Sequence, residues 1–436
     1  MTRPRILMAA VVGLTLGIPG TLPSARAETG ARSNGSPSNE SQSNGTNVVI
    51  AWNEALRALV PPGPSDGQRR YAMLHVAMFD AVNAIERVYT PYRVQVRAAH
   101  GASPEAAAAQ AGHDILSALY PAQQGTFDAL LEAQLADLPR GRALLGRFIG
   151  HRVALEVLEW RQNDGWAAVP PAYVLPPFPG LWQPTPPAFS VAGFTQYPNV
   201  TPFALLTATQ YLPPPPPTLT SERYATDFDE VKRLGSVTSV ERTEEQTLLA
   251  RLFAGVINPI PFVTFWNIVT GDLAEARGLS LVDTARLFVL VNVSIHDGLQ
   301  TSFTSKFVYG LWRPVTAIQR ADEDLNDATI ADPTWLPLLA TPPYPSYAGN
   351  AACLSKAGSR ALELALGTND VTISFTWPGT PAYTREWASL SQLADVVAKS
   401  RVWGGIHYQF DTDASQVACA KVADYVFATF MRPRRD

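Results

Sequence analysis

The chain has 436 residues, of which 46% are apolar and 17% are charged, so it can bury a sizeable core in one or two domains. The formal net charge is −4 and the sequence pI is about 5.9, which excludes the basic surface that binding to a phosphate backbone needs. Nucleic acid is therefore not an expected partner.

Residues 1–27 have the organisation of a secretory signal peptide. Arg3 and Arg5 precede an apolar run from Ile6 to about Ile18, and residues 25–27 supply an Ala-x-Ala cleavage site. The apolar run is shorter than the roughly 20 residues that span a bilayer, and no later stretch is both long and uncharged, so no integral membrane anchor is expected. The sequence thus predicts cleavage and a secreted or periplasmic location.

The next segment, residues 28–47, contains almost no large apolar side chains. Such a composition does not repay the entropy of ordering the chain, so these residues are predicted to be a disordered leader. Residues 48–436 are then expected to form a single α-helical domain.

The folded region is dominated by helical patterning. In residues 71–85, Met73, Val76, Ala77 and Phe79 recur at three- and four-residue spacings without an intervening Gly or Pro. Comparable patterns occur in residues 104–118, 141–162, 221–235 and 280–299. No alternating pattern of useful length competes, so the sequence predicts an all-α fold, a helical bundle.

One long segment interrupts this pattern. Residues 168–219 are so rich in proline that neither helices nor central strands can persist there, which predicts a long irregular excursion over the surface. Its aromatic residues favour a loop that packs against the domain over a free interdomain spacer.

The two cysteines, Cys353 and Cys419, leave two possibilities open. In an oxidising compartment they can form one disulfide that closes a long loop. The alternative is two separate buried thiols.

Two segments near the C-terminus carry cations and a histidine. Lys306 and Arg313 are seven residues apart, about 10 Å along a helix, and Arg313 precedes a proline, so it is expected where the chain leaves the helix. Farther on, the Gly404–Gly405 pair allows a turn that brings Arg401 and His407 to one point.

A carboxylate and a helix start complete this group of candidate residues. His407 and Asp411 form an i, i+4 pair, predicted on the following helix, in which the carboxylate fixes the imidazole tautomer. Between the cationic segments, Gly349 and Asn350 lead from a proline-rich loop into a helix, whose N-terminus suits an oxyanion.

The order of the motifs in residues 306–314, 341–353 and 400–411 resembles the signature of the vanadium-dependent haloperoxidases and of the type 2 phosphatidic acid phosphatases that share their fold. The two outer segments match at every signature position. Residues 71–86 also resemble an early helix of bacterial haloperoxidase-like proteins, so the likeness runs over most of residues 48–430. The implied fold is a helical bundle of the vanadium haloperoxidase and acid phosphatase type.

The resemblance implies a site for vanadate, with phosphate as the competing oxyanion. Lys306, Arg313 and Arg401 would neutralise its equatorial oxygens. His407 would be the apical ligand of vanadium, or the nucleophile in a phosphatase, and Asp411 would orient His407.

The middle motif departs from the family, which has Pro-Ser-Gly-His there. One alignment places residues 348–351 in these positions, so that Gly349 and Asn350 would contribute to cofactor binding, and the other places residues 345–348 there. Neither supplies the histidine that serves as general acid and base, a role typically worth about 10² to 10⁴ in rate.

Three interpretations of this missing histidine are open. Asn350 would donate a hydrogen bond to the apical oxygen, His296 would reach in from the preceding helix, or catalysis would be lost. For His296, which sits beside Asp297, the alternative is a hydrogen-bonded core histidine.

The implied function is haloperoxidase-like oxidation of halide by hydrogen peroxide. The alternatives are an acid phosphatase acting on a phosphate ester in the same pocket, and a catalytically impaired oxyanion-binding homologue. Loss of the general acid weighs more against the phosphatase, because a poor leaving group needs its proton. By position in the family, Phe303 and Tyr344 are candidate halide-pocket aromatics, although core packing explains them equally well.

Overall fold

The computed structural model describes residues 26–28, 47–61, 66–257, 260, 262–377 and 382–434. The expected signal peptide and leader lie outside this part of the chain, except for residues 26–28 and 47. The α-helices are α1 Val48–Arg57, α2 Gly67–Glu86, α3 Pro104–Leu119, α4 Gln124–Leu135, α5 Arg140–Arg161, α6 Glu222–Gly235, α7 Glu244–Phe253, α8 Phe262–Ala276, α9 Leu281–Tyr309, α10 Pro314–Gln319, α11 Asn350–Leu366, α12 Leu390–Trp403 and α13 Gln409–Thr429. The mostly helical architecture confirms the predicted all-α bundle.

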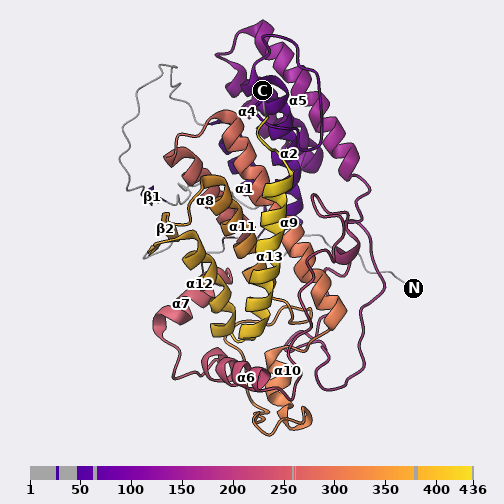
Figure 1. Cartoon of the computed structure of the whole chain (residues 1–436), viewed down its shortest axis with the longest axis vertical. Coiled ribbons are helices and arrows are strands. Elements are labelled where there is room, and N and C mark those ends of the chain that lie inside the picture. The colour runs from indigo at the N-terminus through magenta and orange to yellow at the C-terminus, as the bar shows by residue number, and fades with distance from the viewer. Residues whose placement is uncertain are drawn as a thin grey trace, which may run out of the picture.

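The 29-residue helix α9 is the central element of the bundle. It packs against α2, α8, α11 and α13, and almost all of its residues as far as Lys306 are buried. Ser280 begins it as predicted, since its hydroxyl accepts a hydrogen bond from the backbone N–H of Asp283 at 3.2 Å. In Figure 1, α2 to α5 lie at one end of the molecule, and α6 and α10 lie at the other.

A small antiparallel sheet was not predicted. It contains β1 Arg26–Glu28, β2 Thr372–Trp377 and β3 Tyr383–Trp387, with β2 in the middle. Residues 371–377 alternate apolar and hydroxyl side chains, and the apolar ones are buried, so this segment did contain a strand signal. β1 spans the expected cleavage site, and cleavage after Ala27 would leave only Glu28 of that strand.

The proline-rich excursion packs against the domain, as predicted. Trp182 and Tyr197 are each only 2% exposed. The backbone N–H of Trp182 donates to the carbonyl of Gly310 at 2.7 Å, and the backbone N–H of Trp312 donates to the carbonyl of Gly180 at 2.9 Å. These bonds fix the excursion against the chain segment that joins α9 to α10.

The described helices include none whose length and hydropathy would let it cross a membrane.

Cys353 of α11 and Cys419 of α13 form a disulfide, with their Cα atoms 5.4 Å apart, so the first of the two possibilities for the cysteines is confirmed. Both residues pack beside Gly298 of α9, where an added Cβ would lie 3.2 Å from Cys353 Sγ. The disulfide therefore joins α11 to α13 at the point where both helices contact α9.

Replacement of both cysteines by alanine is expected to lower the free energy of unfolding by about 4 kcal/mol, because the disulfide closes a loop with a sequence separation of 66 residues. Urea unfolding of the wild type and of the Cys353→Ala/Cys419→Ala variant measures the difference. A reductant should lower the unfolding midpoint of the wild type alone, and an equal effect on both proteins would contradict this assignment.

Candidate active site

The three predicted segments converge, and each site residue lies at or beside a helix end. Lys306 is in the last turn of α9, Arg313 precedes α10, Gly349 and Asn350 begin α11, Arg401 is in the last turn of α12, and His407 and Asp411 flank the start of α13. Arg313, as expected, sits where the chain has left α9 and turns back. Helix ends position these side chains because the chain reverses direction there, next to its neighbours.

The glycine pair makes the turn between Arg401 and His407. Gly405 adopts a φ of +76°, and an added Cβ there would lie 2.4 Å from the carbonyl oxygen of Gly235, so both the backbone conformation and the packing require glycine. His407 lies two residues before α13, and the prediction that it is on that helix was wrong. The turn itself brings His407 to Asp411.

The tautomer of His407 follows from its two partners. Asp411 Oδ2 lies 2.8 Å from His407 Nδ1, and Arg313 Nη1 lies 3.1 Å from His407 Nε2. A guanidinium only donates, so Nε2 accepts and Nδ1 carries the proton that is donated to Asp411. Burial, and next the positive charges of Arg313, Lys306 and Arg401, hold the pKa of His407 well below its usual range, so Nε2 keeps its lone pair.

Asp411 is held by a serine whose contact with it was not predicted. Ser346 Oγ donates a hydrogen bond to Asp411 Oδ2, and the backbone N–H of Tyr408 donates to the same oxygen at 3.3 Å. Burial raises the pKa of Asp411 to about 6, against the lowering effects of Ser346, Lys306 and Arg313. One of the two alignments placed Ser346 in the oxyanion-binding motif, but neither indicated a contact with Asp411.

The ammonium group of Lys306 is directed at the middle motif. Its Nζ donates hydrogen bonds to the carbonyl oxygens of Pro345 at 3.2 Å, Ser346 at 2.7 Å and Ala348 at 2.6 Å. An ammonium has three N–H donors, so all of them are used on this loop. Burial, and next the charge of Arg313, lower the pKa of Lys306. Lys306 therefore orders this loop, and none of its three N–H groups is left to donate to an oxyanion.

Both arginines have buried donors with no partner among the described residues. These are Nη2 of Arg313 and Nε and Nη1 of Arg401. Burial lowers the pKa of each guanidinium to about 10, so both remain charged near neutral pH. The charge of Asp411 acts on Arg313, but Asp411 is itself hydrogen-bonded to His407 and Ser346, and buried charges without counterions are costly.

The start of α11 adds further donors. Gly349 provides no side-chain cap, and the first backbone N–H groups of a helix have no partner within it. Together with the unpaired guanidinium nitrogens and the unprotonated Nε2 of His407, these groups fit a tetrahedral oxyanion such as vanadate or phosphate.

A cavity of about 240 Å³ opens onto this site. Asn350, Ala351, Arg401 and His407 line it on the polar side. Burial raises the pKa of Tyr344, against the lowering effects of Arg313, Arg401 and Asn350. No histidine occupies the α11 end of this cavity, since residues 350 and 351 are Asn and Ala.

The aromatic residues Phe303 and Tyr344 both line this cavity. Each is 2% exposed, and their ring centroids lie 5.2 Å apart in an edge-on arrangement. Phe303 also stacks on Tyr197 at 4.6 Å. They are thus packed wall residues of the cavity, and the halide-pocket role stays a prediction.

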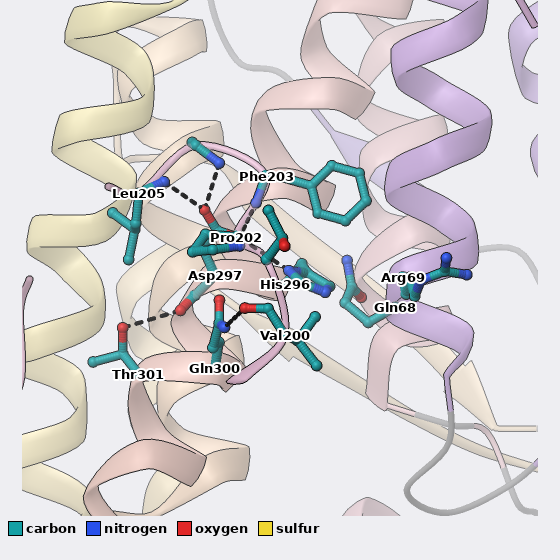
Figure 2. Close-up of polar contacts among 12 residues, drawn as sticks. Gln68, Arg69, Val200, Pro202, Phe203, Leu205, His296, Asp297, Gln300 and Thr301 are labelled. Atoms are coloured by element: carbon teal, nitrogen blue, oxygen red, sulfur yellow. Dashed lines mark hydrogen bonds and ion pairs between the residues drawn. The ribbon is translucent and has the colours of Figure 1, made fainter. Parts of the chain in front are cut away.

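His296 is in the core. Its Nδ1 lies 2.9 Å from Asp297 Oδ1, and Asp297 accepts hydrogen bonds from the backbone N–H groups of residues 203–205, as Figure 2 shows for Phe203 and Leu205. His296 is fully buried and does not line the cavity. It lies ten residues before Lys306 on α9, about 15 Å along the helix axis, so the core interpretation is the one that the geometry supports.

Comparison with known proteins gives the same fold. Residues 286–436 match the family model described as the VCPO second helical-bundle domain. Among solved structures, the first bacterial vanadium-dependent iodoperoxidase is similar over 89% of this chain and 97% of its own, with a TM-score of 0.75 and 22% identity. No curated protein matches the sequence.

Two structures of bacterial vanadium-dependent chloroperoxidase are also similar. The apo form covers 86% of this chain and 96% of its own, with a TM-score of 0.69 and 16% identity. The holo form covers 89% and 94%, with a TM-score of 0.67 and 15% identity. Residues 286–436 thus match the VCPO second helical-bundle domain, and the chain as a whole has the fold of these vanadium-dependent haloperoxidase structures.

Proposed function

We propose that the protein is a vanadate-dependent haloperoxidase-like enzyme that oxidises halide with hydrogen peroxide. The observation that carries this proposal is the set of unpaired guanidinium nitrogens of Arg313 and Arg401 beside the unprotonated Nε2 of His407, which accepts a hydrogen bond from Arg313. When bound, vanadate supplies a Lewis acid that activates peroxide toward halide without changing its own oxidation state. One halide, one peroxide and one proton give hypohalous acid and water.

The residues of the site have separate tasks in this proposal. Arg313 and Arg401 bind the negative oxygens, and His407 Nε2 is the ligand atom. Asp411 keeps the proton on Nδ1, so that Nε2 stays available, and it is itself oriented by Ser346. Lys306 acts through the loop that it hydrogen-bonds, and adds positive charge to the site.

The start of α11, which lines the cavity, carries no side chain suited to proton transfer. Asn350 can donate a hydrogen bond to an oxygen, but an amide does not exchange a proton as an imidazole does. We therefore propose activity that is slow relative to that of an enzyme with a histidine in this place.

We also propose that the protein is secreted or periplasmic. The disulfide between Cys353 and Cys419 supports this location, because such bonds persist in oxidising compartments, and so does the signal-peptide pattern of residues 1–27. N-terminal sequencing of the exported protein is expected to begin at Glu28. Exported protein that retains Met1 would contradict this proposal.

His407→Ala is expected to abolish peroxide-dependent oxidation of iodide and to weaken vanadate binding at least about tenfold, since the ligand nitrogen is lost. Triiodide absorbance and calorimetric titration with vanadate measure the two effects. His151→Ala is the matched control, because its side chain is 57% exposed. Hydrolysis of a phosphate ester without iodide oxidation in the wild type would favour the phosphatase instead.

Ala351→His is expected to raise the rate of iodide oxidation by roughly 10², by placing an imidazole on the cavity wall at the start of α11. The steady-state rate of triiodide formation is the measurement. Ala351→Gln adds a polar side chain without acid–base function and should give no such gain. If both variants behave alike, proton transfer at this position does not limit the reaction.

A further inference from the structure

Helix α5, on the outside of the molecule in Figure 1, carries apolar side chains on its solvent-facing side. Leu144, Phe148 and Leu155 are 68%, 69% and 47% exposed, and their spacings of four and seven residues place them in one stripe along the helix. His151 lies in the same stripe, where its Nδ1 is 2.7 Å from Asp114 Oδ2. The solvent-facing side of a surface helix ordinarily carries charged and polar residues, so this apolar stripe indicates an interaction surface.

The opposite side of α5 is fixed against the start of α3. An added Cβ at Gly146 would lie 2.3 Å from the carbonyl oxygen of Ser103, and one at Gly150 would lie 2.3 Å from that of Ala107. The two glycines therefore let the backbones come into contact. Val153 continues this buried side of α5. A rotation of the helix that buried the stripe would break this contact, so the stripe stays on the surface of the isolated subunit.

The charges at the two ends of the stripe oppose the dipole of their own helix. Arg140 is the first residue of α5, and Glu159 lies in its last turn, whereas the dipole favours an acidic residue at the N-terminus and a basic one at the C-terminus. Both residues are exposed, and neither side chain forms an ion pair or a hydrogen bond with another described residue. These charges are thus unfavourable in the isolated subunit, and a partner with the opposite arrangement of charge would neutralise both.

We infer that the stripe is the interface of a homodimer, in which α5 of one copy packs antiparallel against α5 of a second copy. A two-fold axis midway between Leu144 and Leu155 places each of these residues opposite the other in the second copy, with Phe148 beside the axis. Arg140 and Glu159 each lie four residues outside this leucine pair, so the same axis places Arg140 opposite Glu159. Such a contact contains every pair twice. This inference goes beyond the proposed function and does not depend on it.

The charges favour this occupant over two others. A parallel pair of helices would bring Arg140 against Arg140 and Glu159 against Glu159, whereas the antiparallel pair brings opposite charges together at both ends. An anionic membrane surface would attract Arg140 but repel Glu156 and Glu159 at the other end of the stripe. An antiparallel second copy is the partner that fits both ends.

Replacement of the central aromatic residue tests the interface. Sedimentation velocity over a range of protein concentrations is expected to show a monomer–dimer equilibrium for the wild type. Phe148→Asp should raise the dissociation constant at least about tenfold, because aromatic side chains at the centre of an interface contribute most to affinity. Val417→Asp is the matched control, since Val417 is 60% exposed on α13 and lies outside the stripe. A wild type that stays monomeric at every concentration, or an equal effect of both variants, would overturn the inference.

An exchange of the two end charges tests the antiparallel arrangement. Arg140→Glu should weaken the dimer at least about threefold, because two attractive pairs become two repulsive ones. The double variant Arg140→Glu/Glu159→Arg should restore the dissociation constant of the wild type. The dissociation constant is the measurement, because the exchange also aligns both charges with the helix dipole and so stabilises the monomer by itself. A double variant that dimerises no better than Arg140→Glu would reject the antiparallel contact.

Vesicle binding distinguishes a second copy from a membrane. In co-sedimentation with phosphatidylglycerol vesicles, the wild type is expected to stay in the supernatant. A wild type that is monomeric in solution and sediments with the vesicles, with loss of this binding in Phe148→Asp, would assign the stripe to a membrane surface and overturn the homodimer.

Discussion

The structure depends on a concentration of buried positive charge that the protein itself leaves incompletely neutralised. Arg313 and Arg401 remain charged and keep unpaired donors, with Lys306 close by, while the nearby carboxylate, Asp411, is hydrogen-bonded to His407. Isolated buried charges are unfavourable. Binding of an oxyanion would therefore lower the free energy of this arrangement by neutralising them. The packing of α9, α11, α12 and α13 holds the cations together despite their repulsion.

The same charges determine the state of His407. Burial, and next these charges, keep its imidazole neutral, and Asp411 decides which nitrogen carries the proton. A neutral, oriented imidazole is the form that serves as a ligand. The disulfide and Gly298 stabilise the contact of α11 and α13 with α9, and thereby the positions of Asn350, Asp411 and Lys306.

A site with this concentration of positive charge lies beside a cavity whose wall is mostly apolar. The start of α11, which lines this cavity, carries Asn350 and Ala351 in place of a histidine. The haloperoxidase proposed above would therefore have no imidazole for proton transfer at this point.

The sequence by itself determined the helical architecture, the docked proline-rich excursion and the grouping of Arg313, Arg401, His407 and Asp411, because periodicity and helix-end residues act locally. The alternating apolar and hydroxyl side chains of residues 371–377 also indicate a strand, although none was predicted there. Only the tertiary structure decided that Lys306 binds the loop carbonyls, that Ser346 binds Asp411 and that His296 lies in the core. Those outcomes depend on which segments meet across the bundle, which no local pattern encodes.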